Sequence, residues 1–362
     1  LVGVLDLDKL KSGIPDEAFK PIGDDDKEKV REAKGCNAAE RKGALFHRAF
    51  RQELESLAAP LRVIEDVPED TPEQVRKKAE TCRQLEGSLE FRKLELACDA
   101  WTAAFFQAYA ASQPSIVTTS TLHDALSKGH IPDARLAGQI LLEKNERRFF
   151  HWPLAFPEVF IQGGFDVVIG NPPFMGGLKI SGTLGDKYRH WLEFAYKPYG
   201  GTADLCAAFY RRAYELLKPS GRMGMVATNT VGQGDTRESG LAAILCQGGT
   251  ITFAKRFIKW PGAANVEVNL VAIHKPDHSP FAIRHSPILD DQPVDFISSR
   301  LDAEPEAKPK RLPQNEGKAF QGDIVRGIGF VLEPEEAEAL LAKDARNADC
   351  LFPYLNGEDL NS

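Results

Sequence analysis

The sequence predicts an α/β protein in which an open sheet follows a mostly helical segment. Two observations support this fold class. After residue 164, short apolar runs rich in β-branched residues alternate with helical stretches, and this alternation is typical of an open sheet. Before residue 150, the chain is rich in Glu, Lys, Leu and Ala, which favour helices.

Residues 1–150 are expected to be mostly helical. The stretch TPEQ, which begins at Thr71, has the pattern of a capping box with proline at the first helical position. The stretch NAAE, which begins at Asn37, predicts another helix start for the same reason. A further helix is expected over 133–147. The stretch 151–160 is aromatic and interrupted by proline, so it predicts an extended connection.

The second half of the chain predicts four strands. FDVVIG, residues 165–170, is a short β-branched run that is typical of a strand buried on both faces. The other three strands are expected at 221–228, 250–257 and 266–275. A helix is expected over 203–218, and the next helix is expected to begin with Asp235 as its N-cap.

The predicted organisation has four parts. They are a helical segment over 1–150, the sheet over 151–276, a linker or surface excursion over 277–316, and the start of a further domain over 317–362. The third part is charged and contains several prolines, which is typical of a linker. The chain opens with LVGVLDLDKL, without methionine, and ends abruptly, so we expect an internal piece of a longer protein.

Composition narrows the function classes. The net charge of −7 argues mildly against nucleic acid as a partner, although a basic face can exist on an acidic chain. The six cysteines are scattered without a C-x-x-C pair, so neither a metal site nor a disulfide framework is expected. No apolar run reaches the roughly 20 residues of a membrane span, and no signal peptide opens the chain. We therefore expect a cytoplasmic protein without a membrane partner.

The stretch NPPF, Asn171 to Phe174, follows the first predicted strand, and open α/β sheets bind ligands beyond the carboxyl ends of their strands. Each proline fixes its own φ and forces the residue before it into an extended form. The side-chain carbonyl of Asn171 and the backbone carbonyl of Pro172 therefore form a rigid pair of acceptors. Two acceptors that face one point suit an NH₂ group. We refer to residues 171–174 as the NPPF hook.

The hook suits methyl transfer to an exocyclic amine of a nucleobase. Such an amine is a poor nucleophile because its lone pair is delocalised into the ring. Acceptors on its hydrogens free the lone pair and stabilise the positive charge that develops on nitrogen. Rigidity holds the acceptors in place beforehand, and Phe174 offers a flat face for a base extracted from its helix. The alternative is a proline turn that merely ends the strand.

The hook resembles motif IV of the amino-methyltransferases that use S-adenosylmethionine. Four stretches resemble the γ class of N6-adenine DNA methyltransferases, and most of all the large fused restriction-modification (type IIG/IIL) and phage-defence enzymes. They cover residues 151–160, 168–192, 201–238 and 260–275. The resemblance is strong over 150–276, moderate in the tail LFPYLNGEDLN and weak over 1–150.

This resemblance implies a fold, a reaction and partners. The fold is a partial Rossmann-like methyltransferase sheet, with 151–276 as the catalytic half, 1–150 as a helical insertion and 317–362 as the start of a target-recognition domain. The reaction is S-adenosylmethionine-dependent methylation of adenine N6 in double-stranded DNA by base flipping. The partners are the DNA and the upstream and downstream parts of the same protein.

The resemblance also implies roles for individual residues. Asn171, Pro172, Pro173 and Phe174 are the implied catalytic residues, and Asn171, Pro173 and Phe209 the implied cofactor contacts. Phe174 and Trp260 are the implied faces for the flipped adenine, and Lys179, Lys187 and Arg189 are candidates for phosphate contacts. Phe209 as a core residue, Trp260 as a buried structural tryptophan and the three cations as solvated surface are the alternatives.

One departure from the family pattern limits the cofactor site. Residues 1–164 contain neither the glycine-rich cofactor loop nor the acidic ribose ligand that precede motif IV in the family. The S-adenosylmethionine pocket is therefore expected to lie mostly outside this chain, and the chain to be inactive alone. The alternatives are methylation of RNA guanine N2 or of a protein glutamine, or a non-catalytic DNA-binding subunit. Phe174, where glutamine enzymes usually carry Tyr, and the tail beyond 317 favour DNA.

Overall fold

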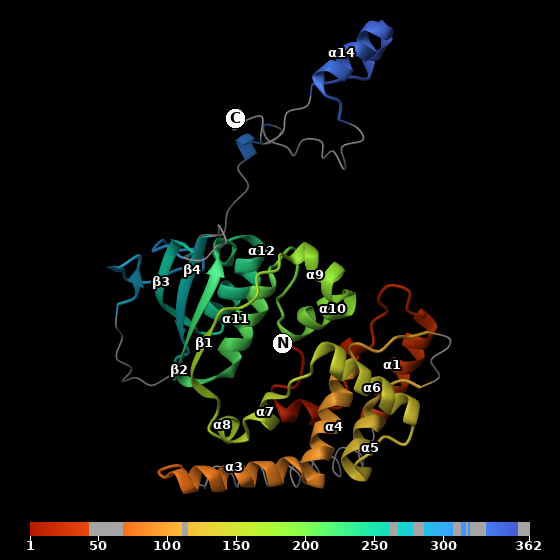
Figure 1. Ribbon diagram of the computed structural model, residues 1–362, viewed down its shortest axis with the longest axis vertical. Coiled ribbons are helices and arrows are strands. Elements are labelled where there is room, and N and C mark those ends of the chain that lie inside the picture. Colours follow the sequence, from red (N-terminus) through yellow and green to blue (C-terminus); the bar gives the residue numbers. More distant parts are fainter. Residues whose placement is uncertain are drawn as a thin grey trace. The chain divides into compact units, whose positions relative to one another are not determined.

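The computed structural model describes residues 1–42, 68–110, 115–260, 267–277, 286–306, 313–315, 318 and 331–353. The chain divides into two compact units, Leu1–Glu306 and Ala307–Ser362. The first unit contains both the helical segment and the sheet (Figure 1). The described part of the second unit contains helix α14, Pro334–Lys343, which begins with a capping box at Glu333.

The first half of the chain is helical in its described part, as the composition predicts. Its helices are α1 (Lys27–Lys42), α3 (Pro72–Glu86), α4 (Leu89–Ala103), α5 (Thr119–Lys128) and α6 (Ala134–Arg147). The capping box at Thr71 is confirmed, because its hydroxyl accepts from Gln74 N at 3.3 Å while the Gln74 side chain accepts from Thr71 N at 2.9 Å.

The expected helix start at Asn37 is wrong. Asn37 is fully buried inside α1, and its carboxamide donates to Ile14 O at 2.8 Å and accepts from Thr119 N at 2.9 Å. Such an internal amide satisfies backbone groups of two other segments, so a tertiary contact explains an asparagine that resembled a cap.

The stretch 151–160 was expected to be extended, and this prediction is wrong, because most of its residues lie in two short helices. They are α7, Trp152–Ala155, and α8, Pro157–Ile161, each with a proline in its first turn. Proline is tolerated there because the first helical N–H groups have no partner within the helix. The prolines of this stretch therefore start helices.

Within the described residues, the sheet has six strands in the order β1-β2-β4-β3-β5-β6, and Figure 1 labels the first four in the chain, β1 to β4. Its main strands are β1 (Phe165–Gly170), β2 (Leu217–Thr228), β3 (Thr250–Lys259) and β4 (Glu267–His274), and β5 (Ile288–Leu289) and β6 (Gln292–Pro293) form a short hairpin. Strand β1 is parallel to β2, and β4 is antiparallel to both of its neighbours. Strands β1, β2 and β3 therefore all end at the same edge of the sheet.

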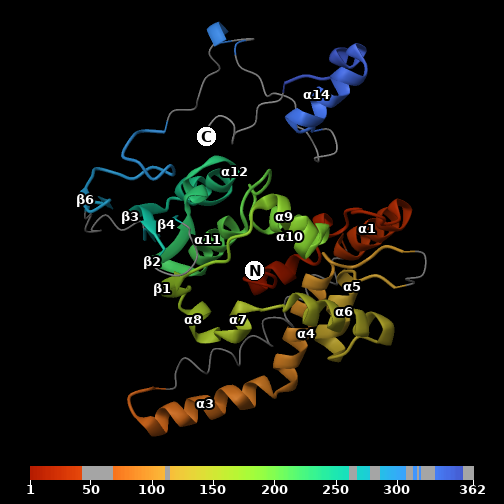
Figure 2. The same cartoon turned by 45° about the horizontal axis from the view of Figure 1, so that its top comes forward.

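The expected α/β fold class is confirmed, and the four expected strands coincide closely with β1 to β4. Helices α9 (Gly177–Leu184), α10 (Asp186–Ala195) and α11 (Leu205–Leu216) lie between β1 and β2, and α12 (Gly234–Arg237) lies between β2 and β3. A π-helical turn, Glu238–Ala242, and α13, Ala243–Cys246, follow. Helices α9 and α12 lie near the end toward which β1 and β2 point (Figures 1 and 2).

In the described residues, helix α11 packs on one face of strands β1 and β2. Tyr210 and Tyr214 of α11 belong to the same hydrophobic cluster as Met223 and Met225 of β2. On the opposite face of β1, Val167 is 57% exposed and Ile169 is 83% exposed. The expectation that β1 is buried on both faces is therefore wrong within the described residues, because α11 covers the face of β1 opposite Val167 and Ile169.

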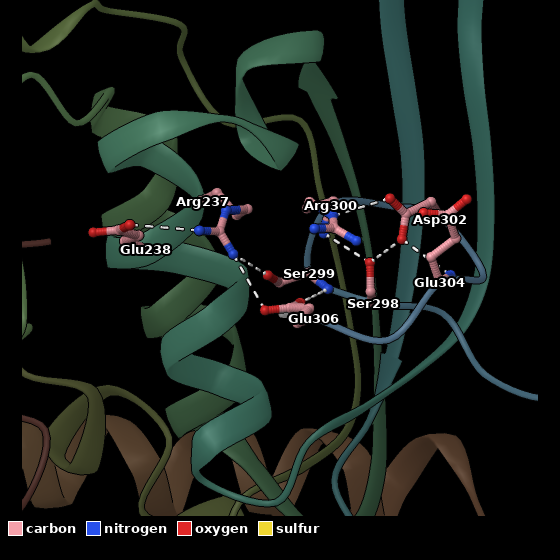
Figure 3. Close-up of polar contacts among 8 residues, drawn as sticks. All are labelled: Arg237, Glu238, Ser298, Ser299, Arg300, Asp302, Glu304 and Glu306. Atoms are coloured by element: carbon pink, nitrogen blue, oxygen red, sulfur yellow. Dashed lines mark hydrogen bonds and ion pairs between the residues drawn. The ribbon is translucent and has the colours of Figure 1, made fainter. Parts of the chain in front are cut away.

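Part of the stretch expected to be a linker packs against the sheet unit. Arg237 of α12 donates to Ser299 Oγ at 2.8 Å and to Glu306 at 3.2 Å (Figure 3). Leu301 is buried, with a φ of +60°. Residues 298–306 are thus fixed to α12 up to the boundary between the two compact units.

Candidate active site

The NPPF hook is exposed at the carboxyl end of β1. Asn171 and Pro173 are exposed, Pro172 is buried, and the Phe174 side chain is 40% exposed. Among the described residues, none forms a hydrogen bond with the Asn171 carboxamide. The buried Pro172 anchors the hook. The carboxamide of Asn171 and the ring of Phe174 remain exposed and can contact a ligand.

The end of the hook is fixed to the start of α11. Met175 N donates to the Asp204 carboxylate at 3.3 Å, and Leu205 N donates to Met175 O at 2.9 Å. Asp204 is also the N-cap of α11, because the same oxygen accepts from Cys206 N at 2.9 Å. This carboxylate therefore ties the hook to a helix of the core.

Three residues after the hook, the backbone of Gly177 lies close to the backbone of Thr202 and Ala203. A Cβ on Gly177 would lie 2.5 Å from Thr202 C and 2.6 Å from Ala203 O, so only glycine fits here. Arg189 of α10 joins the same two segments, donating to Gly177 O at 3.2 Å and to Gly201 O at 2.6 Å.

The three cations expected near DNA phosphates differ in their surroundings. Arg189 holds backbone carbonyls, as described above. Lys187 donates to Asp25 at 3.1 Å and to Gln107 O at 2.6 Å, so its ammonium joins α10 to the helical segment. Lys179 of α9 is exposed and has no partner among the described residues. Of the three, Lys179 alone presents an uncommitted charge.

Helix α12 also contacts the loop before α11 that contains Gly201 and Thr202. Asp235 accepts from Thr202 N at 2.6 Å and from Thr202 Oγ1 at 2.9 Å, and these bonds lower the pKa of its carboxyl group. The expectation that Asp235 is an N-cap is wrong, since α12 begins at Gly234 with Gln233 as N-cap. The carboxylate instead holds the loop that contacts the hook.

A buried acceptor lies at the end of the neighbouring strand. Asn229 follows β2, and its amide nitrogen donates to Glu267 at 3.3 Å. Its side-chain oxygen is buried and has no hydrogen-bond partner among the described residues. Asn229 is not among the residues predicted from the sequence, although its signal is a polar residue directly after an apolar strand.

The remaining expected site residues are half-buried. Phe209 of α11 packs against both hydrophobic clusters of the first unit, which agrees with its alternative as a core residue. Trp260 follows β3 at the same sheet edge as the hook. The strands β1 and β3 are three strand spacings apart, about 14 Å. The roles of these two residues remain predictions.

A cleft of about 700 Å³ lies beside the supports of the hook. Gly201 and Asp235 line it together with His190, Phe194 and Tyr199, but no hook residue does. Within the ranges given above, no group of three His, Cys, Asp or Glu side chains is placed to hold a metal ion. Similarly, no described helix is both long and apolar enough to cross a membrane.

The described residues fit one side of an S-adenosylmethionine site. The open carboxamide of Asn171 and the exposed ring of Pro173 lie at the sheet edge, and β1 is the outermost strand. The described residues before β1 contain no strand, so they offer no glycine-rich loop at a strand end.

Comparisons with known proteins match the region that contains the hook. Residues 85–245 match the family model described as Eco57I restriction-modification methylase, and this region includes the hook, α9 to α12 and β2. The type II methyltransferase M.XhoI of Xanthomonas vasicola is 37% identical over 65 residues, which is 18% of this chain. Those residues cover 11% of that relative's length.

Two solved structures are similar at low sequence identity. A structure of the type IIL restriction-modification enzyme MmeI in complex with DNA has a TM-score of 0.39 and 14% identity, covering 91% of this chain and 50% of that chain. A class I S-adenosylmethionine-dependent methyltransferase from Listeria monocytogenes has a TM-score of 0.27 and 12% identity, covering 75% and 92%. Together, the family match and the curated relative support a methyltransferase of the restriction-modification type.

Proposed function

We propose that this chain contains the adenine-binding half of an S-adenosylmethionine-dependent DNA methyltransferase, which methylates the N6 amine of a flipped adenine. The observation that supports this most is the exposed hook at the open edge of the sheet. No described residue hydrogen-bonds the Asn171 carboxamide, and the backbone at Met175, directly after the hook, is held by Asp204 and Leu205.

The hook residues have separate roles in this proposal. The Asn171 side-chain oxygen and the Pro172 carbonyl accept hydrogen bonds from the two hydrogens of the amine. The nitrogen lone pair is then available, and the positive charge that forms on nitrogen is stabilised where it develops. Phe174 stacks on the base, because a flipped base exchanges its neighbours in the duplex for an aromatic face.

S-adenosylmethionine, when bound, supplies a methyl group on positively charged sulfur. Asn171, Pro173 and Phe209 are the residues of this chain that would touch it. The described residues before β1 lack a strand-end loop for its remaining contacts. We therefore expect residues 1–362 alone to bind S-adenosylmethionine weakly and to be inactive, and tight binding in a calorimetric titration would contradict this.

DNA is the proposed substrate because both the sequence resemblance and the comparisons lead there. The family model and M.XhoI are methyltransferases of restriction-modification type, and MmeI was solved with DNA. Lys179, in the helix that follows the hook, is exposed and pairs with no described residue, so it suits a phosphate contact. Because the chain spans half the length of MmeI, the activity is assigned to the full-length protein.

The test is the change Asn171→Ala in the full-length protein, assayed with tritiated S-adenosylmethionine. We expect methylation of unmodified DNA to fall by about 10²–10³-fold, as when one preorganised hydrogen-bonding group is removed. The melting temperature should stay the same, since Asn171 is exposed and makes no described hydrogen bond.

The substrates assayed in parallel separate the alternatives. DNA with adenine already methylated at N6 should accept no label, and neither RNA nor a release-factor protein should accept any. Tritium on RNA or on the protein would show that this molecule, and not DNA, is the substrate of the same reaction. Undiminished DNA methylation by Asn171→Ala would refute the enzymatic role of the hook.

A further inference from the structure

Phe257 adopts a strained backbone conformation inside a strand. Its φ is +54°, in the left-handed region that residues with a Cβ disfavour. A conformation of this kind persists only where the surroundings force it, and such residues cluster at functional sites. The position lies in β3, where an extended residue would otherwise be expected.

A β-bulge, held by two side chains, imposes this conformation. Lys255 pairs with Leu270 and Ile258 pairs with Val268, so β3 carries one extra residue between these pairs. The two N–H groups of the bulge are satisfied by side chains of other strands and turns. Arg256 N donates to Asp290 at 2.8 Å, and Phe257 N donates to Asn269 at 3.0 Å.

The bulge turns an aromatic ring toward solvent. The Phe257 side chain is 58% exposed, and Asn269, which fixes it, is only 4% exposed. The Arg256 guanidinium lies over the ring, 5.6 Å from its centroid, and is itself held by Asp290, with 2.9 Å between Nε and the carboxylate. The ring is thus oriented from one side and open elsewhere.

The neighbourhood has the composition of a nucleic-acid contact. Residues 255–260, KRFIKW, interleave three cations with two aromatic residues in a chain of net charge −7. Lys255 and Arg256 are paired with Asp291 and Asp290, whereas Lys259 is exposed and has no partner among the described residues. In nucleic-acid contacts of this kind, bases stack on aromatic rings and phosphates bind the neighbouring cations.

The strand register places Phe257 level with the hook. Ile258 pairs with Val268, which pairs with Thr228, and Thr228 lies three residues beyond Met225, the partner of Gly170. Phe257 and the hook therefore reach the same height at the sheet edge. They are separated by three strand spacings, about 14 Å, which exceeds the span of one base between two stacked rings.

We propose that Phe257 is a stacking residue for a nucleobase of the DNA other than the target adenine. This inference rests on the proposed function, because DNA must lie along the edge that carries the hook. The bulge, Asp290 and Asn269 then act as positioning residues that hold the ring toward the duplex.

The test is Phe257→Gly in the full-length protein, because glycine relieves the backbone strain while it removes the ring. We expect a melting temperature equal to or above that of the wild type, together with a dissociation constant about 5- to 100-fold higher for unmodified mixed-sequence duplex DNA. Fluorescence anisotropy of a labelled duplex measures the second quantity. Phe257→Tyr should restore binding.

Ser220→Gly is the matched control. Ser220 also has a positive φ, +66°, and is exposed, but it lies near the start of β2 at the opposite edge of the sheet. Its dissociation constant should equal that of the wild type. Wild-type affinity in Phe257→Gly, or a melting temperature below that of Ser220→Gly, would overturn the inference.

The outcomes distinguish this inference from the proposed function. Wild-type protein that binds DNA without methylating adenine refutes the proposed function, and the Phe257 contact is then judged from the two dissociation constants alone. Wild-type protein that binds no DNA refutes both. Wild-type protein that methylates adenine, with equal affinities for both variants, refutes only the role of Phe257.

Discussion

Removal of the Asp204 carboxylate should damage both the fold and the hook. The change Asp204→Ala removes the N-cap of α11, a loss that costs about 1 kcal/mol. It also leaves the Met175 N–H without its acceptor at 3.3 Å, which costs about 1–3 kcal/mol where the group stays buried. We expect the free energy of unfolding to fall by roughly 2–4 kcal/mol in total.

The effect on methylation should exceed what the loss of stability explains. Met175 directly follows Phe174, so a shift of its backbone moves the hook, and a displacement of about 1 Å can reduce a rate about 100-fold. Urea unfolding measures the stability, and tritium transfer to DNA at a temperature where the variant is folded measures the rate. Asp204→Asn keeps an acceptor oxygen and should recover part of both losses.

Asp133→Ala is a matched control in the same chain. Asp133 caps α6 in the same way, accepting from Arg135 N at 2.9 Å and from Leu136 N at 3.2 Å, but it makes no contact with the hook. It should lose comparable capping stability and keep its methylation rate. If Asp204→Ala kept a rate within about twofold of Asp133→Ala, the proposed support of the hook would be refuted.

Two further predictions follow from the contacts around the hook. Gly177→Ala should lower stability by about 1–3 kcal/mol, because its Cβ would meet backbone atoms. Gly182→Ala in the same helix meets nothing within 4 Å and should be neutral or stabilising in the same urea titration, and equal effects would contradict the argument. The pKa of Asp235 is lowered, so its contribution is complete above the unfolded pKa and is lost as the pH falls through the folded one. Thermal unfolding should show wild type above Asp235→Asn at pH 7, with the difference shrinking as the pH falls below the ordinary Asp value of 3.8, and a difference that persisted undiminished in acid would be evidence against this linkage.

The features that could be predicted from the sequence are those with local causes. The hook is a prediction of this local kind, because two consecutive prolines restrict their own backbone whatever surrounds them, and its exposure at the end of β1 is what the structure adds. The strands β1 to β4 were found because short β-branched runs bounded by turns encode them directly. The capping box at Thr71 is local in the same sense, since both of its hydrogen bonds join residues three positions apart.

The features that could not be predicted depend on distant segments. Asn37 matched a capping pattern, but its amide binds residues 23 and 82 positions away. Arg189 appeared suited to a phosphate, yet the carbonyls that it holds come together only when the loop before α11 meets the hook. The bulge at Phe257 requires Asn269 and Asp290, which pattern and propensity along β3 do not reveal.

The helical segment takes part in holding the hook, although it lies far from it in sequence. Trp101 and Phe105 at the end of α4 pack on Trp191 of α10, with ring centroids 6.1 Å and 5.0 Å apart. Arg189 lies two residues before Trp191 on the same helix and binds the carbonyl of Gly177 at the hook exit. Burial of these rings therefore fixes the helix that fixes the hook. The contacts make the end of α4 part of the scaffold on which the proposed adenine site depends.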